Sequence, residues 1–234
     1  MPIDDSFARN NLLQLPPLIK DLSLSYRLKS PAGAKSGLVL LLHGMGHSET
    51  SLHGFLDLLP EDLAVALVRL PLETGPGAYR AFSARFTPDG PVIDAVEAES
   101  SLCKLVDFVG EIQGRTRVAP SRTLIAGFSQ GGIMANALAL TNPQAVVGFC
   151  ILSGRILPEI EHLIAPPAAL SHLRALVLHG DNDEVLPEAW ADRSAALLQR
   201  LGVSFKKKRH AAGHEITPAM ANDMASWVHA VLGG

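Results

Sequence analysis

The chain has 234 residues, of which 47% are hydrophobic and 18% charged, and its formal net charge is -3. A composition this apolar supports a substantial buried core and excludes disordered and fibrous proteins. The weak, well-mixed charge predicts no nucleic-acid partner, and no segment approaches the roughly 18 apolar residues that cross a bilayer, so no stable membrane insertion is expected.

Short apolar runs predict a series of β-strands along the chain. Residues 22–28 alternate apolar and polar side chains, as a half-exposed strand does, whereas residues 38–43 form a continuous apolar run typical of a buried central strand. Further strands are expected at 63–70, 123–128, 145–152, 174–179 and 203–208.

Longer segments between these runs carry apolar residues at helical spacing. Helices are expected at 92–113, 130–140, 187–202 and 218–232. Because strands and helices alternate, we predict an α/β fold with a mostly parallel central sheet and helices on both faces. Residues 1–234 are expected to form a single domain, with residues 1–20 as an N-terminal extension packed on or near the sheet edge. Ligands should bind at the carboxyl ends of the strands.

A G-x-S-x-G motif lies where the pattern changes from strand to helix. Gly127, Ser129 and Gly131 are its defining residues. Such a turn forces the serine into a strained backbone conformation, and glycines on either side let the strand and the helix approach closely. We therefore predict that Ser129 is an exposed nucleophile at a strand-to-helix elbow.

A serine nucleophile needs a histidine to accept its proton and usually a carboxylate to orient the ring. Asp181 and Asp183 both follow the strand expected at 174–179, and spacing alone does not separate them. We expect Asp183 to be the acid, and the competing interpretation makes Asp181 a turn former.

The histidine is expected in the loop between the last strand and the last helix. His214 lies directly before that helix, and His210 is the alternative, expected to face solvent at the strand end. His43 and His179 each end a central strand and are predicted to serve packing and loop hydrogen bonds.

The loop after the strand at 38–43 is where an oxyanion-binding backbone amide is expected. Met45 is the predicted donor, and the amide of Gln130, the residue after the nucleophile, is the second. A metal site at His43 and His47 is not expected, because that spacing suits a helix and not a strand end. No phosphate-binding loop, dinucleotide motif or metal-spaced cysteine pair is present in the sequence, so neither a cofactor nor a metal is predicted.

Cys103 and Cys150 lie in apolar segments, where buried thiols are more usual than a disulfide. The first residues are acidic where a secretory leader would be basic. A cytoplasmic location is therefore expected.

Four motifs, LLLHGMG, GFSQGG, HGDNDEVLP and GHEI, together resemble the phospholipase/carboxylesterase family of α/β-hydrolases, which includes the acyl-protein thioesterases. The resemblance extends from about Gly37 to Val231. It implies an α/β-hydrolase fold with a minimal lid and no cofactor, with Ser129, Asp183 and His214 as the catalytic triad. It also implies oxyanion amides at Met45 and Gln130.

The chain departs from this family between residues 72 and 91. Many members carry Trp-Phe-Asp where this chain reads Ala81-Phe82-Ser83. This segment leaves the carboxyl end of a central strand, so Tyr79 and Phe82 are candidates to bind substrate. The alternative is an ordinary surface loop anchored by two aromatic side chains.

The predicted function is serine hydrolysis of small carboxylic esters with short to medium acyl groups, extending to thioesters or lysophospholipids, through an acyl-enzyme. The expected partner is a small-molecule ester, and a homodimer is compatible with the sequence. Two alternatives stay open: a ligand-binding receptor that kept the hydrolase pocket, and a peptidase or perhydrolase that uses the same triad.

Overall fold

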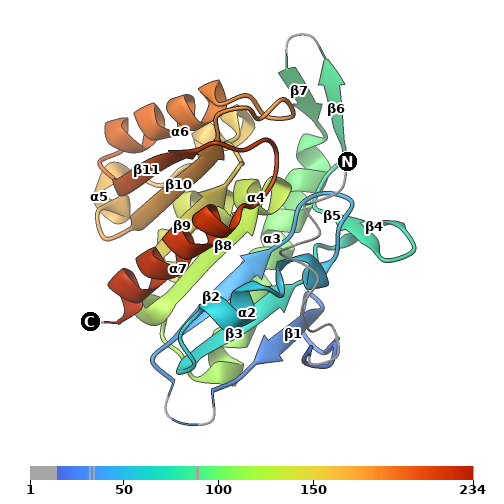
Figure 1. The fold of residues 1–234 in the computed structure, drawn as a ribbon, viewed down its shortest axis with the longest axis vertical. Helices are drawn as coiled ribbons and strands as arrows, with labels where there is room; N and C mark the ends of the chain where they lie inside the picture. The colour runs from blue at the N-terminus through green and yellow to red at the C-terminus, as the bar shows by residue number, and fades with distance from the viewer. Residues whose placement is uncertain (1–14, 32, 34, 88–89, 234) are drawn as a thin grey trace.

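A seven-stranded sheet forms the centre of the computed structural model, which describes residues 15–31, 33, 35–87 and 90–233 (Figure 1). The strand order is β1-β3-β2-β8-β9-β10-β11. β1 is antiparallel to β3, and every other neighbouring pair is parallel. The strands are β1 (Tyr26–Lys29), β2 (Gly37–Leu42), β3 (Leu63–Val68), β8 (Thr123–Phe128), β9 (Gly148–Leu152), β10 (Arg174–Gly180) and β11 (Ser204–His210).

Helices cover both faces of this sheet. Within the described ranges, the four long ones are α3 (Ala95–Thr116), α4 (Gln130–Thr141), α6 (Ala189–Arg200) and α7 (Pro218–Leu232), and the short ones are α2 (Phe55–Leu58) and α5 (Pro167–Leu170). α3, α4 and α6 pack against one face, whereas α7 and α2 pack against the other (Figure 1). The sequence of β2 is continuously apolar because an apolar core lies on each face of the sheet. Leu40 packs into the core on the side of α3, α4 and α6, and Leu41 packs into the core on the side of α7 and α2.

The predicted α/β-hydrolase fold is confirmed, and the strand and helix order follows the prediction closely. Two expectations were wrong. Residues 22–25 do not belong to β1, and the Ser23 N–H instead donates to the Glu111 carboxylate at 2.7 Å. Residues 72–93 are not a plain loop that leads into a helix at residue 92. They contain two hairpins, β4 (Leu72–Gly75) with β5 (Ala78–Arg80), and β6 (Ala84–Thr87) with β7 (Gly90–Ile93), so the helix begins only at Ala95.

The start of the chain is only partly described. Residues 1–14 of the expected extension lie outside the described residues, so the single-domain boundary stays a prediction. Ile19 pairs with Tyr26, and Arg27 donates to the carbonyl of Pro16 at 2.7 Å. Residues 16–19 therefore lie against β1, the edge strand.

The two cysteines differ in burial. Cys150 is buried in β9, as expected, but Cys103 is exposed on α3, so the prediction for Cys103 was wrong. Cys103 lies off the apolar stripe by which α3 meets the sheet. Across the described ranges, no helix is long and apolar enough to cross a membrane.

Candidate active site

Ser129 lies at the turn between β8 and α4 in a strained conformation. Its φ is 52° and its ψ is -118°, a region that residues other than glycine rarely adopt. The backbone N–H of Ser129 donates to the carbonyl of Leu152 in β9 at 2.8 Å, which ties the turn to the neighbouring strand. The predicted elbow geometry is present.

The glycines of the motif are required by close backbone packing. A Cβ at Gly127 would lie 2.2 Å from the backbone carbon of Gly131, and a Cβ at Gly131 would lie 2.1 Å from the carbonyl oxygen of Leu42. Neither distance is sterically possible, so only glycine allows α4 to begin against β8 and β2. This packing sets where the Ser129 hydroxyl emerges.

His214 connects Ser129 to Asp183. Its Nε2 lies 2.9 Å from Oγ of Ser129, and its Nδ1 lies 2.7 Å from Oδ2 of Asp183. A carboxylate only accepts hydrogen bonds, so Nδ1 carries the ring proton and Nε2 presents a lone pair to the hydroxyl. The Phe128 ring lies 5.0 Å from the imidazole and limits its movement. The three side chains therefore form a hydrogen-bonded chain that can transfer a proton.

Asp183 is buried and held on both carboxylate oxygens. Oδ1 accepts from the backbone N–H groups of Val185 and Leu186, at 3.0 and 2.8 Å. His179 lies 3.4 Å from Oδ2 and donates through Nε2 to the carbonyl of Leu186 at 2.7 Å, which confirms its predicted loop-bonding role. These bonds fix the carboxylate in the orientation that His214 needs.

Neither rival residue contacts Ser129 or His214 through its side chain. Asp181 is exposed and accepts a hydrogen bond from the side chain of Asn182 at 2.8 Å. The expectation that His210 faces solvent was wrong: its side chain is only 8% exposed, and Nε2 lies 3.1 Å from Asp223 in α7. The carboxylate of Asp223 thus lies against this ring.

The β2 loop, residues 43–47, lies beside the nucleophile. A Cβ at Gly44 would lie 3.5 Å from Cβ of Ser129, so the loop backbone is in contact distance of the elbow. Met45, which is 37% exposed, and Gln130 both border the same pocket as Ser129. The two residues predicted to supply oxyanion amides thus border the pocket at the nucleophile.

Sequence reasoning missed a contact made by the side chain of Gln130. Its Oε1 accepts from the Ala81 N–H at 2.6 Å, and its Nε2 donates to the Phe82 carbonyl at 2.8 Å. The amide thus pairs with the backbone of residues 81–82 as a neighbouring strand would. A lone glutamine after a motif gives no signal of such pairing.

His43 anchors the β2 loop from inside the core. The Leu70 N–H donates to Nε2 at 3.1 Å, so the proton of the neutral ring is on Nδ1, which donates to the Gly44 carbonyl at 2.7 Å. Burial lowers the pKa of His43 to about 4 and keeps the ring neutral at physiological pH. The predicted loop-bonding role is confirmed, and both ring nitrogens are occupied by hydrogen bonds.

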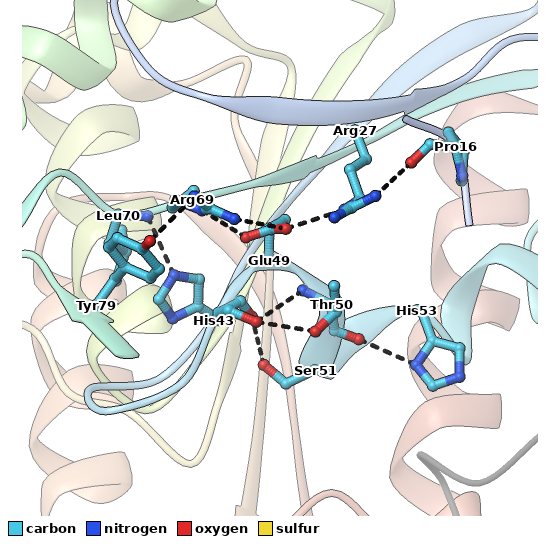
Figure 2. Close-up of polar contacts among 11 residues, drawn as sticks. Pro16, Arg27, His43, Glu49, Thr50, Ser51, His53, Arg69, Leu70 and Tyr79 are labelled. Atoms are coloured by element: carbon cyan, nitrogen blue, oxygen red, sulfur yellow. Dashed lines mark hydrogen bonds and ion pairs between the residues drawn. The ribbon is translucent and has the colours of Figure 1, made fainter. Parts of the chain in front are cut away.

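A buried ionic cluster, which the sequence did not reveal, lies behind this loop (Figure 2). Glu49 is 1% exposed and accepts hydrogen bonds from Arg27 at 2.9 Å and from Arg69 at 2.7 and 3.0 Å. Burial by itself would raise the pKa of Glu49, but the bonds from the two guanidinium groups outweigh it and hold the pKa below its usual value.

Tyr79 joins the Glu49 cluster to the β2 loop (Figure 2). Its phenol oxygen accepts from Arg69 at 3.1 Å. Its backbone pairs with the loop: Gly46 N–H donates to Tyr79 O at 2.9 Å, and Tyr79 N–H donates to His47 O at 2.8 Å. Tyr79 therefore contacts the loop from behind, which corresponds to the anchoring alternative considered for it.

A small, mostly apolar pocket opens at Ser129. Beside the nucleophile it is bordered by Met45, Phe82, Ile93, Ile133, Arg155 and Leu186. Phe82, 1% exposed, thus lies where a substrate-binding residue was expected, whereas Tyr79 is not among the described residues that border the pocket.

Comparison with known proteins identifies the family. Residues 85–232 match the family model described as Phospholipase/Carboxylesterase. The chain belongs to this family. Lysophospholipase-like protein 1 of Mus musculus is 26% identical over 88% of this chain and 91% of its own length. Acyl-protein thioesterase 1 of Eremothecium gossypii is 26% identical over 82% of this chain and 87% of its own length.

A solved structure has the same fold as this phospholipase/carboxylesterase family member. The carboxylesterase from Mesorhizobium loti superposes with a TM-score of 0.79 at 22% identity, covering 91% of this chain and 97% of the other. The central sheet and the helices that cover it are therefore features of the shared fold.

Proposed function

We propose that this protein is a serine carboxylesterase in which Ser129 is the nucleophile, His214 the general base and Asp183 the residue that orients the imidazole. The observation that carries the proposal is the 2.9 Å contact between Nε2 of His214 and Oγ of a serine whose φ is 52°. A hydroxyl is a weak nucleophile at neutral pH, and this contact is the one that activates it.

The proposed reaction has two displacements. His214 Nε2 takes the hydroxyl proton as Oγ bonds to the substrate carbonyl carbon, and the backbone amides of Met45 and Gln130 stabilise the oxyanion. The imidazolium then gives that proton to the leaving alcohol or thiol, which departs from the acyl-enzyme. Water then attacks the acyl carbon as His214 takes its proton, and the imidazolium returns that proton to Ser129 Oγ as the bond from Oγ to the acyl carbon breaks and the acid leaves.

The proposed substrates are esters with short to medium acyl groups, and thioesters and lysophospholipids lie within the range to be tested. The named relatives support this range, and the small apolar pocket at Ser129 favours compact acyl groups. The hydrogen-bonded chain of Ser129, His214 and Asp183 supports an enzyme that turns over its substrate, and not a receptor that only binds a ligand. We also propose a cytoplasmic location, which suits two free cysteines.

The test combines covalent labelling with turnover. A fluorophosphonate probe should label the wild-type protein once, at Ser129, and 4-nitrophenyl butyrate should be hydrolysed over many turnovers. Ser129→Ala should lose both, whereas Ser171→Ala, which changes an exposed serine in the segment after α5, should keep both. Labelling at another serine, or wild-type turnover by Ser129→Ala, would contradict the proposal.

A further inference from the structure

Arg155 is a buried cation without an acidic partner among the described residues. It is 2% exposed, its Nη2 donates to the Pro91 carbonyl at 3.3 Å, and its Nε has no hydrogen-bond partner in the described part of the chain. The guanidinium lies over the Trp190 ring, 4.4 Å from the centroid. One long backbone contact and one aromatic face are weak compensation for a desolvated charge, which normally has a carboxylate beside it.

The guanidinium remains charged in this environment. Burial lowers the pKa of Arg155, with a partly opposing effect from the more distant Glu159, but a guanidinium titrates so far above neutrality that it keeps its proton. Arg155, which carries this permanent positive charge, is thus one of the residues that border the mostly apolar pocket at Ser129.

The backbone of Arg155 follows a segment that packs on the nucleophile elbow. Arg155 follows β9, whose Leu152 carbonyl accepts from the Ser129 N–H at 2.8 Å. A Cβ at Gly154 would lie 3.0 Å from the Ser129 carbonyl oxygen, so the residue before Arg155 packs directly on the elbow. The Arg155 side chain thus starts next to the serine that attacks the substrate carbonyl, and it borders the same pocket.

The pocket that contains Arg155 is on the acyl side of the scissile bond. Ser129 and both predicted oxyanion residues, Met45 and Gln130, border it, but His214 is not among the described residues that do. The leaving group must face His214, because the imidazolium returns the proton to it. The group that extends toward Arg155 is therefore the acyl chain.

We propose that Arg155 binds a carboxylate at the far end of the acyl group, so that the preferred substrates are monoesters of short dicarboxylic acids. This inference rests on the proposed function and narrows its substrate class. A guanidinium presents paired N–H donors that match the two oxygens of a carboxylate, and a buried pair of this kind is stronger than the same pair in water.

The experiment compares two esters of equal chain length, mono-4-nitrophenyl glutarate and 4-nitrophenyl pentanoate, with Ser129→Ala as the background. For the wild type, kcat/KM should be at least about tenfold higher for the glutarate monoester. In Arg155→Met this ratio should fall to about one. Arg193→Met is the matched control, because Arg193 lies over the same Trp190 ring, 4.6 Å from its centroid, but outside the pocket, and it should keep the wild-type ratio.

Two results would overturn the proposal: a wild-type preference for the pentanoate, or an unchanged ratio in Arg155→Met. The ratio of kcat/KM for the two esters in the wild type tests the proposal even if Arg155→Met fails to fold. Failure of the proposed function is distinguishable, because neither ester would then be hydrolysed and the fluorophosphonate probe would not react. In that case glutarate itself, titrated into Ser129→Ala by calorimetry, still reports whether the pocket binds a carboxylate.

Discussion

The guanidinium of Arg69 lies over the Tyr79 ring, 4.4 Å from its centroid, and donates a hydrogen bond to its phenol oxygen at 3.1 Å. The backbone of Tyr79 pairs with Gly46 and His47 in the β2 loop. The loop expected to stabilise the oxyanion is therefore linked through one tyrosine to the buried ionic cluster at Glu49.

Tyr79→Phe removes the bond to Arg69 but keeps the ring and the backbone pairing. Since complete loss of an oxyanion donor costs on the order of a hundredfold in rate, a loosened loop should lower kcat for 4-nitrophenyl butyrate by roughly fivefold, with little change in KM. Tyr26→Phe is the matched control, because the Tyr26 phenol also contacts an arginine, Arg115, away from the site. An equal decrease in kcat in both variants would contradict a specific role for Tyr79.

Glu49→Gln should destabilise the protein, because it leaves two arginines around a neutral amide. Removing one member of a buried ionic group is costly, but Arg27 and Arg69 are about one-fifth exposed, so water partly screens their charges. We therefore expect the free energy of unfolding to fall by about 2 kcal/mol. Urea denaturation at pH 7 measures it. Glu61→Gln, at an exposed position, should change stability by less than about 0.5 kcal/mol. If the two variants have the same midpoint, the cluster does not stabilise the fold.

Asp183→Asn tests which aspartate orients His214. An amide at this position can donate to the imidazole and favour the wrong tautomer, so kcat should fall about a thousandfold or more while the fold is kept. Asp181→Asn is two residues away, exposed and not in contact with the ring, and should retain nearly full activity. Steady-state kinetics with 4-nitrophenyl butyrate separates the two, and a reversed order would assign the role to Asp181.

Gly131→Ala tests the backbone packing that forms the elbow. The added methyl group would lie 2.1 Å from the Leu42 carbonyl, so we expect a loss of about 3 kcal/mol or more in unfolding free energy. Gly110→Ala is the control: it lies within α3, has nothing within 4 Å of the added Cβ, and should gain roughly 0.5 to 1 kcal/mol. Thermal or chemical denaturation measures both, and equal effects would indicate that the close approach at Gly131 is not needed.

The buried, neutral His43 predicts a pH-dependent stability. Its pKa is lowered from 6.5 to about 4 in the folded protein, so the unfolded chain binds the extra proton between these values. The stabilisation that depends on a neutral His43 is fully present above pH 6.5. It declines as the pH falls toward 4, which lowers the free energy of unfolding by on the order of 3 kcal/mol. Denaturation at pH 7 and pH 5 should show a smaller stability difference in His43→Asn than in the wild type. An unchanged difference would mean that His43 does not carry the effect.

Local sequence patterns were sufficient for the elbow and for most of the sheet. Gly127 and Gly131 are recognisable because a close backbone approach requires glycine wherever it occurs. The hairpins between residues 72 and 93 were not recognisable, because their strands are only three or four residues long, too short for an alternating pattern to stand out from chance.

The sequence by itself determined the order of strands and helices, the elbow at Ser129 and the expectation of a histidine before the last helix, because these depend on periodicity and on residues a few positions apart. Only the tertiary structure decided that His214 and Asp183 meet Ser129, that Tyr79 anchors the β2 loop, and that Arg155 is buried in the pocket without an acidic partner among the described residues. These contacts join residues far apart in the chain, and their geometry follows from the packing of the whole sheet, which local propensity does not encode.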